Sequence, residues 1–440
     1  MNKLFHKPSV PAQLLISNAH VLDPRTGLDG AHDVLISDGV VAELSAPGAI
    51  PRPPQAAVID ATGKHLFPAF TDPHVHLRTP GQEYKENIES GTRAAAAGGF
   101  CQLIAMPNTS PTVDSTSVLK ALIATAGQQA QVPTAFTAAV TVGLEGQILA
   151  PMAALAEAGA IAFTDDGKPI TSAGMLRKAL QYQRLAGGVI ALHEEDPTLS
   201  GDGAMHEGSV SARLGVSGIP SLSESLMVGR DSAIALYEQA QVHCQHISAR
   251  ESVEIMHHFQ QLGALVTGEA TPHHLILTHE DVAGLDTTRK MNPPVRTEDD
   301  RQAVIEGLKS GVLSCIATDH APHSRREKEL AFEQAPMGTT GLETSFASVY
   351  TELVRPGILP LGLVIERMTA GCAIFGLPIP RIEAGAEANL VLIDLERTWK
   401  VGETGYVSRA SNCCFDGYTF NGVVELTLAA GQLAFQRERP

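Results

Sequence analysis

Two histidines separated by a single residue, His74 and His76, are the strongest local sign of chemistry in this sequence of 440 residues. They belong to the segment FPAFTDPHVHLR at residues 67–78. On an extended strand, side chains two residues apart point to the same side, so both imidazoles can bind one metal ion. The pair alone is equally compatible with the polar end of a strand. A metal site therefore needs support from other parts of the chain.

That support comes from residues that close short apolar runs later in the sequence. His193 ends the run VIALH, His246 ends VHCQH, and Asp319 follows LSCIAT. Asp165 and Asp166 follow GAIAFT in the same way. Imidazole nitrogens and carboxylate oxygens suit a borderline cation such as Zn²⁺. Because a carboxylate can bridge two cations, one of the paired aspartates could hold a binuclear centre together, and a site for one ion is the alternative.

Such a centre predicts hydrolysis of an amide. A bound metal ion lowers the pKa of its water from about 15.7 toward 7 and polarises the carbonyl that the resulting hydroxide attacks. A further group must take the hydroxide proton and pass it to the departing nitrogen. Asp319, at the end of the last strand, is the best-placed general base and acid. A purely ligating role for Asp319 is the alternative.

The elements that must position these residues follow a repeating pattern. A short apolar run followed by a helix-compatible stretch recurs about eight times, which indicates βα units and a parallel sheet. The predicted strands end near Asp72, Met106, Val140, Thr164, His193, His246, Glu269 and Thr318. Eight units favour a closed barrel with its site at the C-terminal ends of the strands. An open doubly wound sheet is the alternative, but the chain has no GxGxxG or Walker loop to support it.

The sequence pattern differs at both ends of the chain. There, short runs in which apolar and polar residues alternate, as in β-strands, are separated by Gly and Pro. We therefore predict an α/β fold in which a (β/α)8 TIM-type barrel carries a small β-sandwich domain built from both chain ends. Residues 1–66 and 383–440 are expected to form the two parts of that domain. Residues 67–382 are expected to form the metal-dependent catalytic barrel.

The composition excludes some classes of partner. Against 48 Asp and Glu there are only 32 Lys and Arg, and the formal charge of −16 argues against nucleic acid or an anionic membrane as the main partner. We identify no secretion signal and no apolar run long enough to span a membrane, and we expect a cytoplasmic protein. The six cysteines lack CxxC spacing, so we expect buried, reduced thiols.

Several longer motifs carry a family resemblance. They are HVHLRTPG at 74–81, MPNTSP at 106–111, FTDDG at 163–167, TPHHL at 271–275, KMNPP at 290–294 and ATDHAPH at 317–323. In order and spacing they resemble the dihydroorotase family of the amidohydrolase superfamily, from about Leu14 to the end of the chain. Many relatives bridge their metals with a carboxylated lysine. The DDG segment here is similar to the branch in which an aspartate is the bridge.

The resemblance implies a reaction and a ligand set. The reaction is the reversible zinc-dependent hydrolysis of (S)-dihydroorotate to N-carbamoyl-L-aspartate, in de novo pyrimidine (UMP) biosynthesis. Two Zn²⁺ ions per subunit are expected, with Asp166 as the bridge and Asp165 as support for the loop geometry. One ion would be bound by His74, His76, Asp166 and Asp319, and the other by Asp166, His193 and His246.

The resemblance also implies contacts with the substrate. Arg78 can offer a planar fork of donors to the substrate carboxylate, and Asn108 and His323 resemble further carboxylate contacts. Asn292 and the backbone around Met337 and Gly338 resemble the part that holds the ring amide. The full set of expected substrate contacts is His76, Arg78, Asn108, Asn292, His323, Met337 and Gly338.

Two further segments, the histidine pair at 273–274 and the loop at 323–340, are expected to support the site without binding metal. The ligand set is already complete, so His273 and His274 are expected to orient other residues rather than to bind metal. The charged segment that begins at Ser324 lies within residues 323–340, and we predict that this loop moves over the site.

Other functions compete with this interpretation. An allantoinase or a dihydropyrimidinase would also hydrolyse a cyclic amide, but the DDG segment and the pair Arg78 and Asn108 argue against both. A noncatalytic chain that stabilises an aspartate carbamoyltransferase is the alternative from another class, and the complete ligand set argues against it. The expected partner is a small-molecule substrate, and a homodimer and an association with aspartate carbamoyltransferase are left open.

Overall fold

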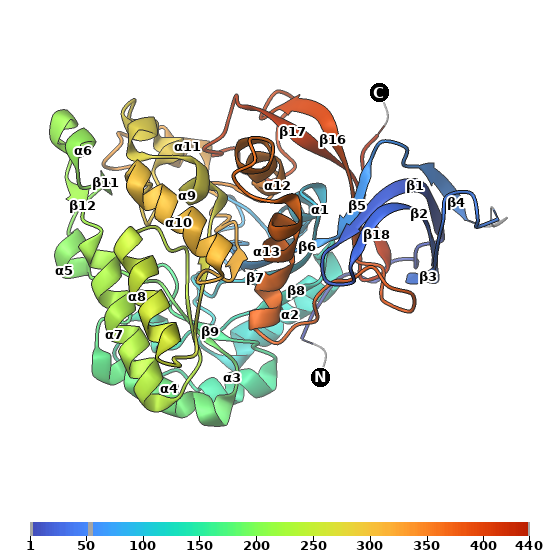
Figure 1. The fold of residues 1–440 in the computed structure, drawn as a ribbon. Coiled ribbons are helices and arrows are strands. Elements are labelled where there is room, and N and C mark those ends of the chain that lie inside the picture. Colours follow the sequence, from blue (N-terminus) through green and yellow to red (C-terminus); the bar gives the residue numbers. More distant parts are fainter. Residues whose placement is uncertain (1–2, 52–55, 439–440) are drawn as a thin grey trace.

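Eight short parallel strands form the centre of the molecule (Figure 1). The computed structural model describes residues 3–51 and 56–438. The central strands are β6 (Phe70–Val75), β7 (Phe100–Ala105), β8 (Thr134–Phe136), β9 (Phe163–Thr164), β10 (Ile190–Leu192), β13 (Val242–Cys244), β14 (Val266–Ala270) and β15 (Cys315–Ile316). They pair as β6-β7-β8 and as β9-β10-β13-β14-β15.

Single bridges join these two ladders into a closed ring. Ala138 pairs with Phe163 between β8 and β9, and Val75 pairs with His320 just after β15. The second junction includes a hydrogen bond of 2.9 Å from the His76 amide to the His320 carbonyl. The closed ring confirms the predicted (β/α)8 barrel and excludes the open doubly wound sheet.

Helices cover the outside of the ring. The longer ones are α1 (Ile88–Ala97), α2 (Thr116–Gln129), α3 (Met152–Ala158), α4 (Ala173–Ala186), α7 (Leu222–Glu238), α8 (Arg250–Gln261), α10 (Glu298–Ser310) and α13 (Leu361–Ile374). Local sequence explains their limits: the Asn87 side chain caps the first turn of α1, and this alanine-rich helix ends at Gly98. Helix α13 packs against both β6 and β15 and so covers the junction that closes the barrel.

Shorter elements lie in the connections. They are η1 (Val142–Leu144), α5 (Pro197–Ser200), β11 (Met205–His206), α6 (Ser209–Leu214), β12 (Gly218–Ile219), α9 (Pro272–Ile276), η2 (His279–Val282), η3 (Thr287–Arg289), α11 (Arg325–Lys328), α12 (Ser345–Val349) and η4 (Tyr350–Val354). No helix within residues 3–51 and 56–438 is long and apolar enough to span a bilayer. All six cysteines are buried.

The third barrel strand differs from its prediction. Its regular part ends at Phe136, whereas the sequence placed the end near Val140. Ala138 still pairs with Phe163, and beyond it the Asp165 carboxylate accepts hydrogen bonds from the amides of Val140 and Thr141, at 2.9 and 3.0 Å. One side-chain oxygen, Oδ1 of Asp165, thus takes the place of the carbonyl partners of a neighbouring strand. The other barrel strands end within three residues of the predicted positions.

A second sheet lies beside the barrel, at the right of Figure 1. It contains β1 (Leu14–Asp23), β2 (Leu28–Ser37), β3 (Val40–Ser45), β4 (Ala57–Asp60), β5 (His65–Pro68), β16 (Leu390–Lys400), β17 (Thr419–Ala429) and β18 (Gln432–Gln436). The order is β18-β17-β16-β5-β1-β2-β3, with β4 also paired to β1. Strand β5 from the first part of the chain pairs with β16 from the last part, with Leu66 opposite Leu392. Both chain ends therefore build one sheet around a core of its own.

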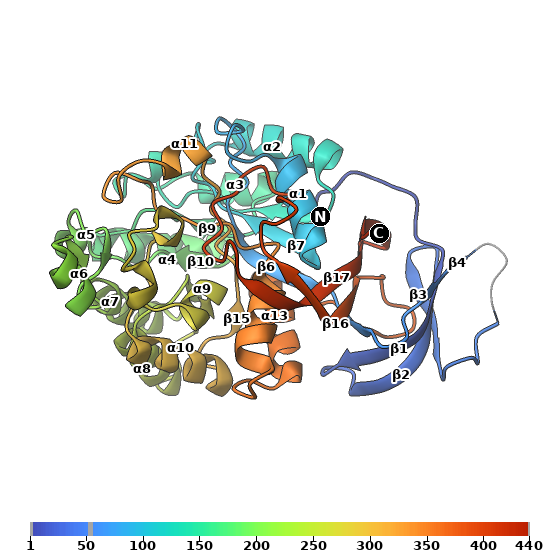
Figure 2. The ribbon, with the colours of Figure 1, turned by 90° about the horizontal axis from the view of Figure 1, so that it is seen from above.

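The connection between β16 and β17 leaves this sheet. Residues 401–418 lie over the barrel in Figure 2. There Cys413 and Phe415 belong to the same buried cluster as Met291 and Phe332 from the barrel loops. Part of the C-terminal segment thus contributes to the catalytic end of the barrel. The domain limits at residues 66 and 382 stay a prediction.

Candidate metal and substrate site

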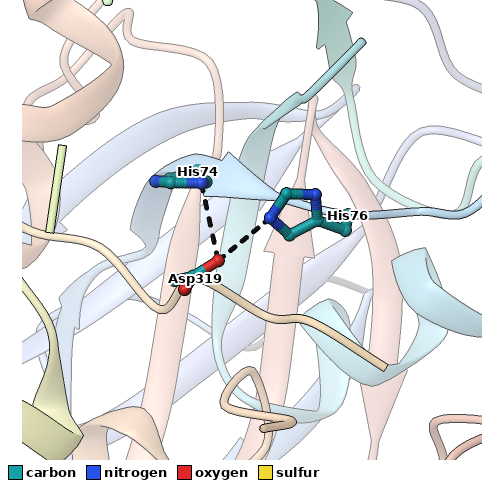
Figure 3. Close-up of side chains that lie close together, drawn as sticks. All are labelled: His74, His76 and Asp319. Atoms are coloured by element: carbon teal, nitrogen blue, oxygen red, sulfur yellow. Dashed lines mark hydrogen bonds and ion pairs between the residues drawn. The ribbon is translucent and has the colours of Figure 1, made fainter. Parts of the chain in front are cut away.

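Four histidines and two aspartates meet at the C-terminal end of the barrel. Figure 3 shows His74 and His76 on β6 and its continuation, both facing Asp319. The Asp319 Oδ1 atom lies 3.5 Å from Nε2 of His74 and 3.0 Å from Nε2 of His76. The barrel junction between β6 and the end of β15 therefore brings together residues 245 positions apart in the chain (319 − 74).

Asp166 lies at the centre of this group. Its Oδ1 atom is 3.3 Å from Nε2 of His74, 3.9 Å from Nδ1 of His193 and 3.8 Å from Nε2 of His246. Its Oδ2 atom is 3.4 Å from Nε2 of His76. Both oxygens thus face imidazoles, and Asp166 is the residue shared by the two expected ligand sets.

The surroundings of His74 fit a cation at its Nε2 atom. Nδ1 of His74 donates to Glu269 Oε1 over 2.6 Å, so a neutral ring carries its lone pair on Nε2. That atom is buried without a hydrogen-bond partner and faces the carboxylates of Asp166 and Asp319. Burial opposes a charge on His74, but the carboxylates of Asp166, Glu269 and Asp319 raise its pKa well above the usual value. The Nε2 position between Asp166 and Asp319 therefore favours a positive charge, which a proton or a bound metal ion can supply. The donor set of imidazole nitrogens and carboxylate oxygens matches a metal ion.

The electrostatics favour ionised carboxylates. Burial alone would raise the pKa of Asp166, but the neighbouring charge of His74 holds that pKa well below the usual range. The pKa of Asp319 is lowered in the same way, against the effect of burial, by His74 and His76. Burial and the proximity of His193 lower the pKa of His246 to about 4. At neutral pH the carboxylates are charged and His246 is neutral, as metal ligation requires.

Carboxylates behind the histidines fix their orientation. Glu269 accepts from Nδ1 of His74 and, at 3.1 Å, from the backbone amide of His246. The Oε2 atom of Glu195 accepts from Nε2 of His193 at 3.1 Å and from the Asn292 amide at 2.7 Å. The bond to Glu269 leaves Nε2 of His74 without a hydrogen-bond partner. The bond to Glu195 leaves Nδ1 of His193 directed at the cluster, 2.9 Å from Nε2 of His246 and 3.9 Å from Asp166. Our sequence reasoning missed both roles, although Glu195 lies two residues after His193 and thus on the same side of an extended segment.

Asn108 and Asp165 also act on neighbouring groups. The Asn108 Oδ1 atom lies 2.9 Å from Nδ1 of His76, so Asn108 orients a candidate metal ligand as well as lining the site. Asp165 accepts from the backbone at Val140 and Thr141 and supports the loop after β8, as expected.

The paired histidines after β14, His273 and His274, lie outside the candidate metal ligands. His274 bonds to the Pro293 carbonyl at 2.9 Å, and both His273 and His274 are buried. Neither belongs to the residue groups that could hold a metal within the described part of the chain.

A cavity of about 230 Å³ opens directly beside the histidines and aspartates. Its wall consists of His76, Arg78, Asn108, Asp166, Gly167, His193, His246, Asn292, Asp319, Ala321, His323, Met337 and Gly338. All seven substrate contacts expected from the sequence are thus brought to one cavity. His74 lies behind the wall and is fully buried.

Two cavity residues have a fixed orientation. Nε of Arg78 donates to the Pro322 carbonyl at 3.1 Å, which anchors the guanidinium at the wall. His323 donates from Nε2 to the Met337 carbonyl at 2.9 Å, and burial and the charge of Arg78 lower its pKa to about 3. A neutral His323 therefore offers no ring N–H to the cavity while this bond persists.

Buried lysines hold the loop at residues 323–340. The Lys328 ammonium donates to the carbonyls of Thr287 and Pro336, each at 2.8 Å. The Lys290 ammonium donates to the carbonyls of Phe332 and Ala335 at 2.7 and 2.8 Å. Both lysines attach the loop to the segment around residues 287–290. Movement of this loop stays a prediction.

Comparison with known proteins adds independent findings. Residues 63–252 match a family model described as dihydro-orotase-like. The chain is 42% identical to the dihydroorotase of Desulforapulum autotrophicum over 420 residues, covering 96% of this chain and 98% of that protein. It is also 42% identical to the dihydroorotase of Pelotomaculum thermopropionicum over 425 residues, covering 96% and 99%.

Solved structures of cyclic amide hydrolases share the fold. The L-hydantoinase (dihydropyrimidinase) of Arthrobacter aurescens superimposes with a TM-score of 0.86 at 25% identity, covering 97% of both chains. The dihydropyrimidinase of Brevibacillus agri superimposes with a TM-score of 0.79 at 23% identity, covering 96% of this chain and 95% of that one. The second likeness shows the fold alone.

Replacing Glu195 with alanine tests the orienting role of its carboxylate. The Glu195→Ala variant should bind Zn²⁺ about 10- to 100-fold more weakly at the His193 side of the centre, because that ring loses its anchor. Titration of the metal-free protein against a competing chelator measures the change. Glu254→Ala, at an exposed glutamate of α8, is the control. Equal zinc affinity in the two variants would contradict the role.

Proposed function

Because the chain belongs to the dihydroorotase family, we propose that it hydrolyses (S)-dihydroorotate reversibly to N-carbamoyl-L-aspartate. The ring-closing direction would serve de novo pyrimidine (UMP) biosynthesis. The observation that carries this proposal is a cluster of four histidines and two aspartates directly beside a cavity that Arg78 also lines. A polar cavity of this kind suits a small anionic cyclic amide.

The proposed cofactor is Zn²⁺, with two ions per subunit. His74, His76 and Asp319 would hold one ion, His193 and His246 would hold the other, and Asp166 would bridge them. When bound, such ions lower the pKa of water toward about 7 and polarise the amide carbonyl. The buried, unpartnered Nε2 of His74 supports a metal here.

Asp319 is proposed as the proton carrier. Its carboxylate lines the cavity and faces His74 and His76, where it would accept a proton from the attacking water. The water oxygen bonds to the ring carbonyl carbon, the bond from that carbon to the ring nitrogen breaks, and Asp319 returns the proton to the nitrogen. Ring closure follows the reverse path and releases water.

The remaining cavity residues are proposed to bind and orient the substrate. The anchored guanidinium of Arg78 would bind the substrate carboxylate, with Asn108 beside it. Asn292 and the backbone at Met337 and Gly338 would hold the ring amide. His323 is proposed as a further carboxylate contact, which requires its bond to Met337 to open or its ring to gain a proton.

Competing functions can be separated by one set of assays. The likeness to an L-hydantoinase structure makes hydantoin, dihydrouracil and allantoin the relevant alternatives. The ring of (S)-dihydroorotate carries a carboxylate that Arg78 can bind, and these three compounds lack it. We expect (S)-dihydroorotate to give the highest kcat/KM. A higher value for one of the others would reassign the substrate, and absence of all turnover would favour a noncatalytic role.

Further proposals concern the cellular location, the assembly and the domain limits of the protein. We propose a cytoplasmic location, and a homodimer or an association with an aspartate carbamoyltransferase as its assemblies. The domain limits proposed are 1–66 and 383–440 for the β-sandwich domain and 67–382 for the barrel. Light scattering of the protein alone and with the transferase would test the assemblies.

Removing the proton carrier should stop the chemistry without unfolding the chain. We expect Asp319→Asn to lower kcat by about 10²- to 10⁴-fold, the range usual for a general acid or base. Circular dichroism should show retained folding, and metal analysis should show whether zinc is retained. Near-normal kcat in a zinc-loaded variant would overturn the assignment.

Removing the guanidinium should weaken substrate binding. Arg78→Ala should raise KM for (S)-dihydroorotate by about tenfold or more, because a charge-assisted bidentate contact is lost. Arg78→Lys should recover only part of this loss, since an ammonium lacks the planar fork. Zinc content should stay unchanged in both variants. Unchanged KM and kcat in Arg78→Ala would dismiss the role.

A further inference from the structure

The connection between β16 and β17 lies over the barrel (Figure 2). Asn412 lies in this connection and is only 3% exposed. Its sequence position belongs to the part of the chain that otherwise builds the second sheet. It does not line the cavity itself.

The Asn412 carboxamide makes three hydrogen bonds to the cavity wall. Its Nδ2 atom donates to the carbonyls of Ala321 and Gly338, at 3.2 and 3.1 Å. Its Oδ1 atom accepts from the backbone amide of His323 at 3.0 Å. A single side chain therefore joins the segment after β15 to the end of the loop at residues 323–340.

The two joined segments approach unusually closely. Gly338 has a φ of +136°, and a Cβ there would lie 2.9 Å from Cβ of Ala321 and 3.1 Å from the His323 ring. Only glycine fits this conformation and this distance. Ala321, His323 and Gly338 all line the cavity, so their separation determines its width on this side.

The Asn412 backbone strengthens the same connection. The Asn412 carbonyl accepts from the Thr340 amide and from the Thr339 hydroxyl, each at 3.1 Å. The Cys414 amide donates to the Thr339 hydroxyl at 2.8 Å. The whole end of the loop is thus bonded to the β16–β17 connection.

We propose that Asn412 is a positioning residue for substrate binding. It holds the backbone of Ala321, His323 and Gly338 at the separation that the ring and carboxylate of the substrate require. The proposal rests on the proposed function for the identity of the substrate. It assigns to the C-terminal segment a part in substrate affinity that the barrel alone cannot supply.

The chemistry of the contact is specific to a carboxamide. An alanine would leave two buried carbonyls and one amide without their partner, and each such loss is costly. An aspartate would still accept from the His323 amide, but its carboxylate would repel the carbonyls of Ala321 and Gly338. Metal binding lies outside this contact, so zinc content and kcat should depend on Asn412 much less than KM does.

The test compares Asn412→Ala with Asn421→Ala. Asn421 is a matched control because it is also buried in the C-terminal segment, accepts from Arg355 at 2.6 Å and donates to the Glu396 carbonyl at 3.2 Å, outside the cavity wall. We expect Asn412→Ala to raise KM for (S)-dihydroorotate by about tenfold or more, with kcat within about threefold and zinc content unchanged. Asn421→Ala should leave KM unchanged.

An unchanged KM in Asn412→Ala, or an equal rise in both variants, would overturn the proposal. If Asn412→Ala does not fold, Asn412→Asp is judged by the same KM criterion. Hydrogen exchange gives a readout that needs no activity: the amide of His323, which loses its side-chain acceptor, should exchange faster in Asn412→Ala than in the wild type or Asn421→Ala. If the wild type turns over no dihydroorotate, the proposed function fails, whereas unchanged exchange at this amide contradicts the positioning role alone.

Discussion

The site depends on the closure of the barrel between its first and last strands. The His76 amide donates to the His320 carbonyl, so the residues before and after this bond are held within a few ångströms of each other. That junction places His74 and His76 opposite Asp319, while the neighbouring strands deliver Asp166, His193 and His246. Without closure, the first and last strands would lie at opposite edges of an open sheet. The parallel arrangement directs every one of these residues to the same end.

Closure of the barrel brings the histidines and aspartates together, but it does not fix the orientation of their side chains. The orientation of each imidazole comes from a partner behind it, with Glu269 at His74, Asn108 at His76 and Glu195 at His193. Glu195 also holds Asn292, so one carboxylate links a candidate metal ligand to a proposed substrate contact. Elsewhere on the cavity wall, Asn412 joins the end of the loop at Gly338 to Ala321, in the segment after β15. The cavity is therefore built by contacts among strand ends, loops and the C-terminal connection.

The features that leave a pattern within a short stretch of sequence could be predicted. Apolar runs ending in His or Asp gave the barrel strands and the six candidate ligands, because a strand end at the catalytic face leaves a local pattern. The third strand was predicted too long, since its end depends on the side chain of Asp165, which lies 25 residues later than Val140. Glu269 and Asn412 were missed for the same reason: their partners are distant in sequence, and a buried carboxylate or amide has no local signature. The pattern of predicted strands also did not indicate that residues 401–418 leave the sheet and lie over the barrel.

The central claim is that the clustered histidines and aspartates form a metal centre that hydrolyses dihydroorotate. The most direct measurement follows hydrolysis of (S)-dihydroorotate through the ultraviolet loss of its ring amide, with protein as purified, after chelation, and after restoring Zn²⁺ to measured stoichiometry. We predict turnover that disappears on chelation and returns as zinc binding approaches two ions per chain. A folded protein loaded with zinc that does not turn over dihydroorotate, or one whose turnover is unaffected by complete metal removal, would contradict the account.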